Sequence, residues 1–301
     1  MSSLSQRIGD FLGVPVTSLA EAGRQHGVQH VTGTLADGRA IFAKIAQGPA
    51  AAIATAFASE ANGLRWLAET DDGPPIPQVI GVSAEFLVIE LIEPQQRASP
   101  EAARRLGADL ARMHATGASA FGAPWPGYIA SLPLDNTPSG DTAPGRATPA
   151  NTDWAAWYAE RRLVPYLRRA RADSLLSRAE ASQVEIVVGR IGELAGPPEP
   201  PSRIHGDLWS GNILWSRNRG WVIDPAAHGG HRETDLAMLA LFGAPYLGEI
   251  VRGYTETKPL AGGWRDRVPL HQLHPLLVHV CLFGRGYAPQ LTAAARAALA
   301  G

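Results

Sequence analysis

The chain of 301 residues contains a single cysteine, Cys281, so it cannot form an internal disulfide or offer cysteine pairs at zinc-ligand spacing. Lysine is almost as scarce, because Lys44 and Lys258 are the only two and arginine supplies the other basic side chains. No apolar run reaches the ~18 residues that a membrane-spanning helix needs, and the first residues lack the apolar segment of a signal peptide. These absences predict a cytoplasmic protein in a reducing compartment, with no membrane partner. Cys281 lies in an apolar segment, and we expect it to be a core residue rather than a reactive thiol.

An excess of charge of one sign is also missing. The formal net charge is −1, and charged residues make up 18% of the chain. This balance provides no basic field for nucleic acid, so we expect no nucleic-acid partner. Apolar residues make up 45%, which is ordinary for a globular protein. The length suffices for a sizeable core divided between two domains, or between two lobes of one domain.

Strand patterns dominate the N-terminal part of the chain. Asp37 and Gly38 form a strong hairpin signal between two short apolar runs. Phe57, Leu64 and Leu67 recur at helical spacing. The predicted elements are, in order, a helix at residues 5–12, strands at 28–35 and 40–46, a helix at 49–69, and strands at 78–82 and 85–91.

Helices dominate after Glu93. The first begins with a serine cap and a proline at its first position, and Leu106, Leu110 and Met113 give it an apolar stripe. Residues 131–152, rich in Pro, Thr, Gly and Asp, are predicted to form a long irregular loop. The predicted helices cover residues 99–116, 153–171, 174–195, 232–242, 245–256, 270–283 and 290–300.

These patterns predict an α+β fold of two lobes. Residues 1–92 would form a small antiparallel-sheet N-lobe, and residues 93–301 a larger, mostly helical C-lobe. A ligand site is expected where the two lobes meet, since pockets form preferentially at such junctions.

The stretch "RIHGDLWSGNILW", residues 203–215, concentrates residues with catalytic chemistry. Asp207 and Asn212 lie five positions apart between two apolar runs, and Asp224 ends the next apolar run, which we expect to pair with residues 212–215 through the turn "SRNRG". One carboxylate can accept a proton from a hydroxyl, while the second carboxylate and the amide oxygen suit Mg²⁺. The spacing matches a kinase catalytic loop followed by its metal-binding Asp. The alternative is a solvated turn, because Asp, Asn, Gly and Ser are turn residues.

A phosphotransferase also needs a cation for the phosphates of ATP. Lys44 lies in the apolar strand "AIFAKIA", and Glu60, sixteen residues later in a predicted helix, is the candidate that holds it in place. The alternatives are an edge-strand lysine that guards against aggregation and a glutamate on a solvated helix face. Both become less attractive because strand, lysine, helix, glutamate and catalytic loop occur in the expected order.

Two further nucleotide contacts are expected from the backbone. Gly23 and Gly27, in "EAGRQHGVQHV", are candidates for the glycine-rich hairpin that covers phosphates, although they do not form G-x-G-x-x-G and can also be ordinary turn glycines. Glu90, Leu91 and Ile92 would link the lobes and hydrogen-bond the adenine through their N–H and C=O groups.

The chain resembles the fructosamine kinase, or ketosamine 3-kinase, family within the aminoglycoside phosphotransferase and choline kinase group of protein-kinase-like folds. The resemblance is carried by "HGDLWSGN" at residues 205–212 and "IDPAAHGGHRETDLAMLALFG" from residue 223. Supporting segments are "LGADLARMH" at 106–114 and "DWAAWYAERRLVPYL" at 153–167. Together they extend over nearly the whole chain. The chain departs from the family in its glycine-rich hairpin, in its long proline-rich loop and in "GYIAS" at residues 127–131.

The resemblance implies roles for individual residues. Asp207 resembles the catalytic base, Asn212 and Asp224 the metal ligands, and Lys44 with Glu60 the phosphate-binding pair. Further candidates around the loop are His205, which would shape it; Asp235, which would brace it; Trp209, which would stack on a sugar or be purely structural; and His231, Arg232 and Glu233, which would line the sugar side or pack the loop.

The resemblance therefore implies an enzyme that uses ATP and Mg²⁺ to phosphorylate the 3-hydroxyl of a ketosamine, free or on a glycated protein, as a step of deglycation. The same-class alternative is a phosphotransferase for an aminoglycoside, choline or a similar amine alcohol. The different-class alternative is a nucleotide-binding pseudokinase, which the presence of Lys44, Asp207 and Asp224 disfavours. The preferred ketosamine and the oligomeric state stay open.

Overall fold

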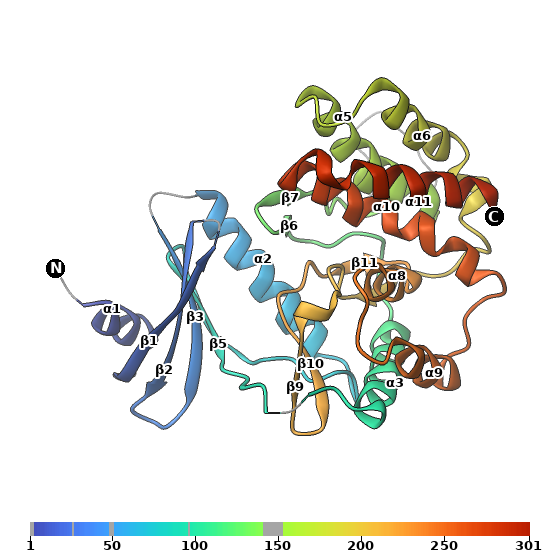
Figure 1. Cartoon of the computed structure of the whole chain (residues 1–301). Helices are drawn as coiled ribbons and strands as arrows, with labels where there is room; N and C mark the ends of the chain where they lie inside the picture. The colour runs from blue at the N-terminus through green and yellow to red at the C-terminus, as the bar shows by residue number, and fades with distance from the viewer. Residues whose placement is uncertain (1–2, 26, 48–50, 96, 141–152) are drawn as a thin grey trace.

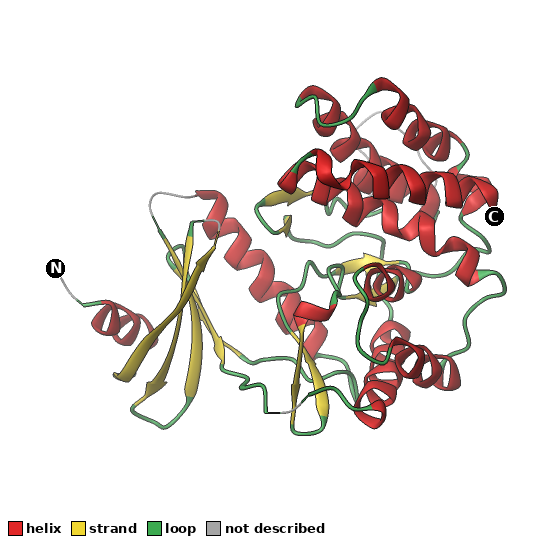
Figure 2. Cartoon of the chain, viewed as in Figure 1, coloured by secondary structure: helices red, strands yellow, loops and turns green. Residues whose placement is uncertain are grey.

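The computed structural model of the chain describes residues 3–25, 27–47, 51–95, 97–140 and 153–301. It consists of an N-terminal region built around one antiparallel sheet and a larger C-terminal region that is mostly helical (Figures 1 and 2). The α+β, two-lobed prediction is confirmed. The predicted helix start at residues 49–50 and the loop residues 141–152 lie outside the described residues. Among the described helices, none is both long and apolar enough to cross a membrane.

The N-lobe sheet has the strand order β1-β2-β3-β5-β4, and every neighbouring pair is antiparallel. Its elements are α1 (Leu4–Leu12), β1 (Val16–Gln25), β2 (Val28–Leu35), β3 (Ala40–Ala46), α2 (Ala51–Ala68), β4 (Val79–Val82) and β5 (Phe86–Glu90). The predicted hairpin at Asp37 and Gly38 is confirmed. Strand β1 is absent from the predicted strands because it lies at the sheet edge with no buried residue, so no apolar alternation marks it.

Side chains of β3 and β5 alternate between the two faces of this sheet. Ile41 and Ala43 pack toward α1, whereas Phe42 packs with Leu87 and Ile89 beneath α2. Because alternate strand residues share a face, Lys44 lies on the α2 side together with Phe42. The strand pattern therefore directs the lysine toward the helix that carries Glu60.

The described part of the C-lobe is a set of helices with three short antiparallel strand pairs, β6–β7, β8–β11 and β9–β10, between them (Figure 2). Its elements are α3 (Pro100–Thr116), β6 (Gly127–Ile129), β7 (Leu132–Leu134), α4 (Trp154–Tyr158), the π-helical turn η1 (Ala159–Leu163), α5 (Val164–Ala172), α6 (Arg178–Gly189), α7 (Ile191–Leu194), β8 (Ser202–Ile204), the 3-10 turn η2 (Ser210–Asn212), β9 (Ile213–Ser216), β10 (Arg219–Val222), β11 (His228–Gly230), α8 (Glu233–Leu241), α9 (Leu247–Thr257), α10 (Trp264–Phe283), the 3-10 turn η3 (Arg285–Tyr287) and α11 (Ala288–Ala300).

Several predicted boundaries in the C-lobe are wrong. The expected loop from residue 131 instead opens with the β6–β7 hairpin. The helix expected at 174–195 is two helices, and the first starts only after Ser177, whose side chain forms a capping box with Glu180. Helix α10 begins six residues before the predicted start, because Pro269, which the sequence rules would place at or before a helix start, lies inside the helix.

The only cysteine, Cys281, lies in α10 and is half-buried. Burial raises the pKa of its thiol to about 11, and Sγ donates to the carbonyl of Tyr166 over 3.5 Å. A thiol of this kind is protonated at neutral pH, as expected for a packing residue.

Candidate active site

The candidate catalytic loop, residues 205–212, connects two separate strand pairs. Strand β8 before it pairs with β11, and β9 after it pairs with β10. The turn between β9 and β10 places Arg217 and Asn218 at φ 51° and 56°, the conformation of a tight hairpin turn. The predicted pairing of the "WVI" run with the strand after the loop is confirmed, since Val222 faces Ile213. This hairpin brings Asp224 back beside the loop.

Gly206 is required by the local backbone. It has φ +80°, and a Cβ atom added there would lie 2.3 Å from the carbonyl oxygen of Ala226. A side chain would therefore both strain the backbone and collide with the neighbouring chain. The position lets the loop turn closely over residue 226 directly before Asp207.

Asp235 of α8 holds the start of the loop through its carboxylate. Its carboxylate is fully buried and accepts hydrogen bonds from the backbone N–H of His205 at 2.8 Å and of Gly206 at 2.9 Å. It also accepts from Nε2 of His114 at 3.1 Å, and Nδ1 of that ring lies 2.8 Å from the Tyr254 hydroxyl. Burial raises the pKa of Asp235, but His114 and the loop N–H groups outweigh it, so that the pKa lies below its ordinary value.

His205 shapes the loop from inside. Its Nε2 lies 2.9 Å from the carbonyl of Ile223 and donates to it, and its Nδ1 accepts the N–H of Asp207 at 3.3 Å. Burial lowers the pKa of the ring, so that it is neutral and keeps one donor and one acceptor. It thereby ties Asp207 to the strand that leads to Asp224.

Asn212 joins the two acids. Its Nδ2 donates to the carbonyl oxygen of Asp207 at 2.8 Å and lies 3.4 Å from both a carboxylate oxygen of Asp207 and the carbonyl of Asp224. Within the described residues, its side-chain oxygen accepts no hydrogen bond. The sequence prediction that Asp207, Asn212 and Asp224 converge is therefore confirmed in space.

Lys44 connects the lobes. Its Nζ lies 2.8 and 2.7 Å from the two carboxylate oxygens of Glu60 and 2.9 Å from Oδ1 of Asp224, which is 180 residues away in sequence. Strand β3 lies in the middle of the sheet, and the side chains of Lys44 and Glu60 are largely buried. The edge-strand and solvated-helix alternatives for these two residues are thereby excluded.

Lys44 lies between the carboxylates of Glu60 and Asp224, and the pKa values of the three groups shift in different ways. Burial lowers the pKa of Lys44, but the carboxylates of Asp224 and Glu60 outweigh it, and the net shift is upward. Burial raises the pKa of Asp224, yet Lys44 brings it below its ordinary value, whereas the pKa of Glu60 is raised by burial and by the charge of Asp224. The site therefore contains a firmly protonated lysine and an ionised Asp224.

Asp207 has a proton affinity suited to a base. Burial, followed by the charge of Asp224, raises the pKa of its carboxyl to about 7, although the hydrogen bond from Asn212 opposes this. Asp224 itself adopts φ 54°, a left-handed conformation that is uncommon outside glycine and often marks functional positions. Its side chain is 44% exposed, so one carboxylate oxygen is open beyond the contact with Lys44.

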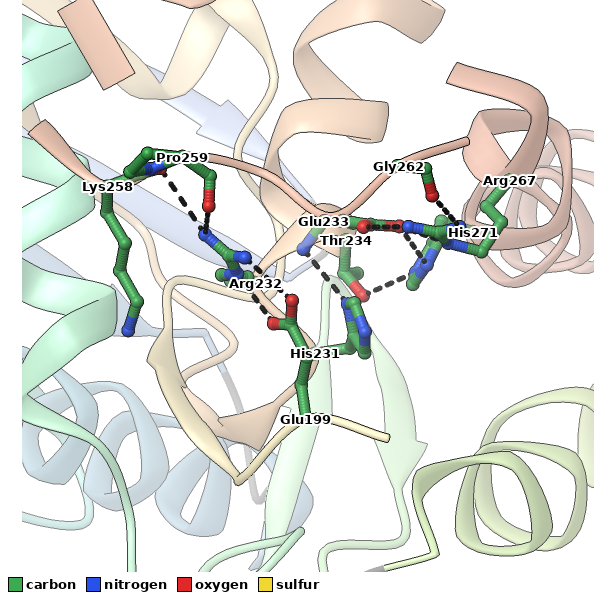
Figure 3. Close-up of polar contacts among 10 residues, drawn as sticks. All are labelled: Glu199, His231, Arg232, Glu233, Thr234, Lys258, Pro259, Gly262, Arg267 and His271. Atoms are coloured by element: carbon green, nitrogen blue, oxygen red, sulfur yellow. Dashed lines mark hydrogen bonds and ion pairs between the residues drawn. The ribbon is translucent and has the colours of Figure 1, made fainter. Parts of the chain in front are cut away.

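The three residues after β11, His231, Arg232 and Glu233, are buried, and their hydrogen bonds within the described residues are to groups outside the candidate catalytic residues. Arg232 pairs with Glu199 at 2.6 and 2.7 Å and also donates to carbonyls of Lys258 and Pro259 (Figure 3). Glu233 pairs with Arg267 at 2.6 and 2.9 Å. The packing alternative thus describes Arg232 and Glu233.

His231 and His271 complete a cluster with Glu233 in which three ligand atoms lie within 4.8 Å of one another. Both oxygens of Glu233 already accept from the Arg267 guanidinium, which would face any divalent cation placed there. Burial raises the pKa of Glu233, but Nε2 of His271 at 3.4 Å and the hydrogen bonds from Arg267 outweigh it and lower the pKa to about 2. We therefore describe this cluster as an ion-pair clamp between α8 and α10.

The remaining predicted residues, in the glycine hairpin and the linker between the lobes, were expected to contact the nucleotide through their backbone. Gly23 follows a bulge in β1, and Gly27 forms the β1–β2 turn, with φ 140° and 77°. The N–H of Glu90 donates to Gln78 and that of Leu91 to Ala40. Two of the three linker N–H groups are therefore already used within the sheet.

Some participants were not predicted. His114 and Tyr254 extend the support of Asp235, and Glu199 and Arg267 are the partners of the buried pairs. His114 had a usable signal, because it lies one helical turn after Leu110 on the apolar stripe of α3 and is buried. The others lie far away in sequence and carry no local signal.

A lysine of a five-stranded antiparallel sheet, paired with a glutamate of helix α2 and set against an Asp–Asn loop of a helical lobe, defines a protein-kinase-like phosphotransferase. The solved structure of an aminoglycoside phosphotransferase with streptomycin and ATP has this fold, with a TM-score of 0.63, 13% identity and coverage of 98% of this chain and 97% of its own. The chain belongs to the fructosamine kinase family, whose family model matches residues 4–300.

Individual relatives agree with this family. The crystal structure of a candidate fructosamine-3-kinase from Thermobifida fusca is 49% identical, with a TM-score of 0.91 over 99% of both chains. A probable ketoamine kinase of Synechocystis is 34% identical over 78% of this chain and 75% of its own length. A probable ketoamine kinase of Thermus thermophilus is 32% identical over 81% of this chain and 82% of its own.

Proposed function

We propose that this protein transfers the γ-phosphoryl group of ATP to the 3-hydroxyl of a ketosamine. The observation that carries the proposal is the convergence of Lys44, Glu60 and Asp224 on one side with Asp207 and Asn212 on the other. Membership of the fructosamine kinase family supports the acceptor class. The proposal also includes a role in deglycation, on free or protein-bound adducts.

The N-lobe would hold the nucleotide. Lys44 is a compact, firmly charged cation kept in place by Glu60, as required for binding phosphate oxygens. The hairpin with Gly23 and Gly27 would cover the phosphates. At the linker, the N–H of Ile92 has no acceptor among the described residues, so it is the donor left for the adenine. We place the boundary between the lobes directly after Ile92.

The donor set fits Mg²⁺. Asp224 has an exposed carboxylate oxygen beyond its contact with Lys44, and the side-chain oxygen of Asn212 accepts no hydrogen bond within the described residues. Both are hard oxygen ligands of the kind that Mg²⁺ takes beside phosphates. When bound there, Mg²⁺ would offset the charge of the β- and γ-phosphates.

Asp207 would act on the acceptor. As the sugar oxygen bonds to the γ-phosphorus, the bond from phosphorus to the leaving ADP oxygen breaks, and the hydroxyl proton passes to the Asp207 carboxylate. A base with a pKa near 7 is half ionised at neutral pH and takes this proton with little loss of driving force. Lys44 and the buried loop hold the charges in place, so positioning and electrostatics supply most of the rate.

The two alternatives make different predictions. An aminoglycoside or choline phosphotransferase shares the fold, but the family model favours a ketosamine acceptor. A pseudokinase would lack the phosphate lysine or one of the two acids, and all three lie together in this site.

A substrate panel tests the proposal. The protein would be assayed with MgATP and glycated lysines of different sugar length, with an aminoglycoside and with choline. We expect turnover of at least one ketosamine, no comparable turnover of the others, and loss of turnover in Asp207→Asn. Full activity of Asp207→Asn, or a preference for the aminoglycoside or choline, would overturn it.

A further inference from the structure

Five aromatic side chains form a continuous row on the C-lobe, which we call the aromatic strip: Trp209, Phe242, His279, Phe283 and Tyr287. Successive ring centroids lie 6.4 Å apart for Trp209 and Phe242, 4.9 Å for Phe242 and His279, and 5.3 Å for His279 and Phe283. Tyr287 closes the row at 4.9 Å from His279. Two members are well exposed, Trp209 at 40% and Phe283 at 55%. Contiguous exposed apolar surface of this kind commonly marks a binding site.

The strip starts at the catalytic loop. Trp209 lies two residues after Asp207, its N–H donates to the Asp207 carbonyl at 3.1 Å, and its indole covers Gly211, where an added Cβ would be 2.1 Å from the ring. Phe242 ends α8, the helix whose Asp235 holds the same loop. The strip then continues to Phe283 at the end of α10 and to Tyr287 in η3.

The strip carries no formal charge. His279 donates from Nδ1 to the Pro275 carbonyl at 2.7 Å, and burial lowers its pKa, so the ring is neutral. Nε2 is therefore left as an acceptor in the middle of the row. Arg285, between the last two members in sequence, turns away to the Leu175 carbonyl and Glu180. Such a surface suits an apolar or aromatic group that can also offer one N–H.

We propose that the aromatic strip binds the substituent on the amine of the ketosamine, in particular a peptide segment with an aromatic residue beside the modified lysine. This inference rests on the proposed function. In a ketosamine only C2 and C1 separate the reacting C3 from the amine, so the substituent leaves the sugar close to Asp207 and Trp209. The rings of the strip, at steps of 4.9 to 6.4 Å, extend further than one sugar ring. Several residues of an extended peptide, at about 3.3 Å each, would cover the length of the strip.

The experiment compares three ketosamines of one sugar: the propylamine adduct, a pentapeptide glycated on its lysine with a neighbouring phenylalanine, and the same peptide with serine there. Variants are Phe283→Ala, Phe283→Trp and the control Ile186→Ala. Ile186 is similarly exposed, at 44%, but lies on α6 outside the strip. The readout is the ratio of kcat/KM for each peptide to that for the propylamine adduct, which cancels any loss of folded protein.

We expect the parent to favour the phenylalanine peptide, and Phe283→Ala to lower its ratio roughly three- to tenfold, the worth of one aromatic contact. Phe283→Trp should keep the ratio, and Ile186→Ala should leave it unchanged. Equal ratios for the two peptides in the parent, or an unchanged ratio in Phe283→Ala, would overturn the inference. A parent that phosphorylates aminoglycosides but none of the three adducts would refute the proposed function, and the inference with it. A shift of Phe283→Ala from dimer to monomer without a change of ratio would assign the strip to a second copy of the chain instead.

Discussion

Replacement of Asp235 by asparagine separates the support of the catalytic loop from its chemistry. The carboxylate contacts neither proposed substrate, but it accepts three hydrogen bonds, from the N–H groups of His205 and Gly206 and from His114. An asparagine has one oxygen acceptor and turns an NH₂ group toward at least one of these donors. The substitution keeps the shape of the side chain and removes part of its function as an acceptor.

The magnitude follows from these contacts. One buried donor loses its partner, at about 1–3 kcal/mol, and the other bonds lose the assistance of a charge. We expect the free energy of unfolding to fall by roughly 2–4 kcal/mol. Because the freed N–H groups directly precede Asp207, a shift of the loop by about 1 Å would lower kcat by roughly 100-fold.

Asp109→Asn is the matched control. Asp109 is also a buried carboxylate, and it accepts from Arg112 and from Arg219, the latter at 2.7 Å. Arg219 lies at the turn end of the β9–β10 hairpin, away from Asn212 and Asp224. This variant should lose stability to a similar extent while keeping its kcat.

Urea unfolding would give the stability of both variants, and kcat would be measured at a temperature where each is folded. If Asp235→Asn were as active as Asp109→Asn at equal stability, the loop would not depend on Asp235, and the reasoning would be refuted.

Three further predictions concern charge. Lys44→Ala should lower kcat by about 10²- to 10³-fold in a phosphoryl-transfer assay, whereas Lys258→Ala, which changes the only other lysine, should retain activity; equal effects would contradict the assignment of Lys44. Because the pKa of Asp207 is raised to about 7 and only its ionised form accepts a proton, kcat/KM should rise with pH through about 7 and level off above it; an acid limb near pH 4 would argue against Asp207 as the base. The pKa of Glu233 is lowered to about 2, below its unfolded value, so its contribution to stability is present above pH ~4.5 and is lost as the pH falls toward 2. The free energy of unfolding of Glu233→Gln should therefore depend less steeply on pH between 5 and 3 than that of the parent. Identical slopes would show that the pair of Glu233 and Arg267 does not cause the pH dependence of stability in this range.

The sequence predicted the elements that bury a periodic apolar face. Phe57, Leu64 and Leu67 mark α2, and Leu106 and Leu110 mark α3, and all five are buried. Lys44 was recognisable because a charged residue interrupts an otherwise apolar strand. In each case a local pattern reports a tertiary contact, since burial of one face is what selects the residues.

Elements without a buried face were missed. Strand β1 is stabilised by hydrogen bonds to β2 and has no fully buried residue; only Val16 and Leu19 pack partly against the core, so its apolar pattern is too sparse to mark a strand. The π-helical turn η1 inside the predicted helix 153–171 changes the backbone register and leaves no mark in residue type. Here backbone pairing, which every residue type can provide, decides the structure.

Residues of the segments that carry the resemblance to the family have different surroundings in the structure. Trp209 is exposed beside Asp207, whereas Arg232 and Glu233 are buried in ion pairs at the start of α8. Helix α8 also carries Asp235, which hydrogen-bonds the catalytic loop. The two ion pairs therefore hold in place the helix that positions this loop. A sequence motif next to a catalytic loop can thus consist of residues that support the loop as well as residues that contact the substrate.

The start of α8 carries two adjacent ion pairs of opposite polarity, and one of them, Glu233 with Arg267, belongs to the ion-pair clamp. Arg232 reaches Glu199, just before β8, and Glu233 reaches Arg267 at the start of α10. A buried pair is costly to break by removal of one partner, because the other charge stays buried. The start of α8 is therefore held from both directions, toward the strand that enters the catalytic loop and toward the helix that ends in the aromatic strip. Helix α8 carries Asp235, which holds the catalytic loop, and Phe242 of the aromatic strip directly follows it. If the strip binds the amine substituent, α8 therefore sets the distance between the base Asp207 and the aromatic strip.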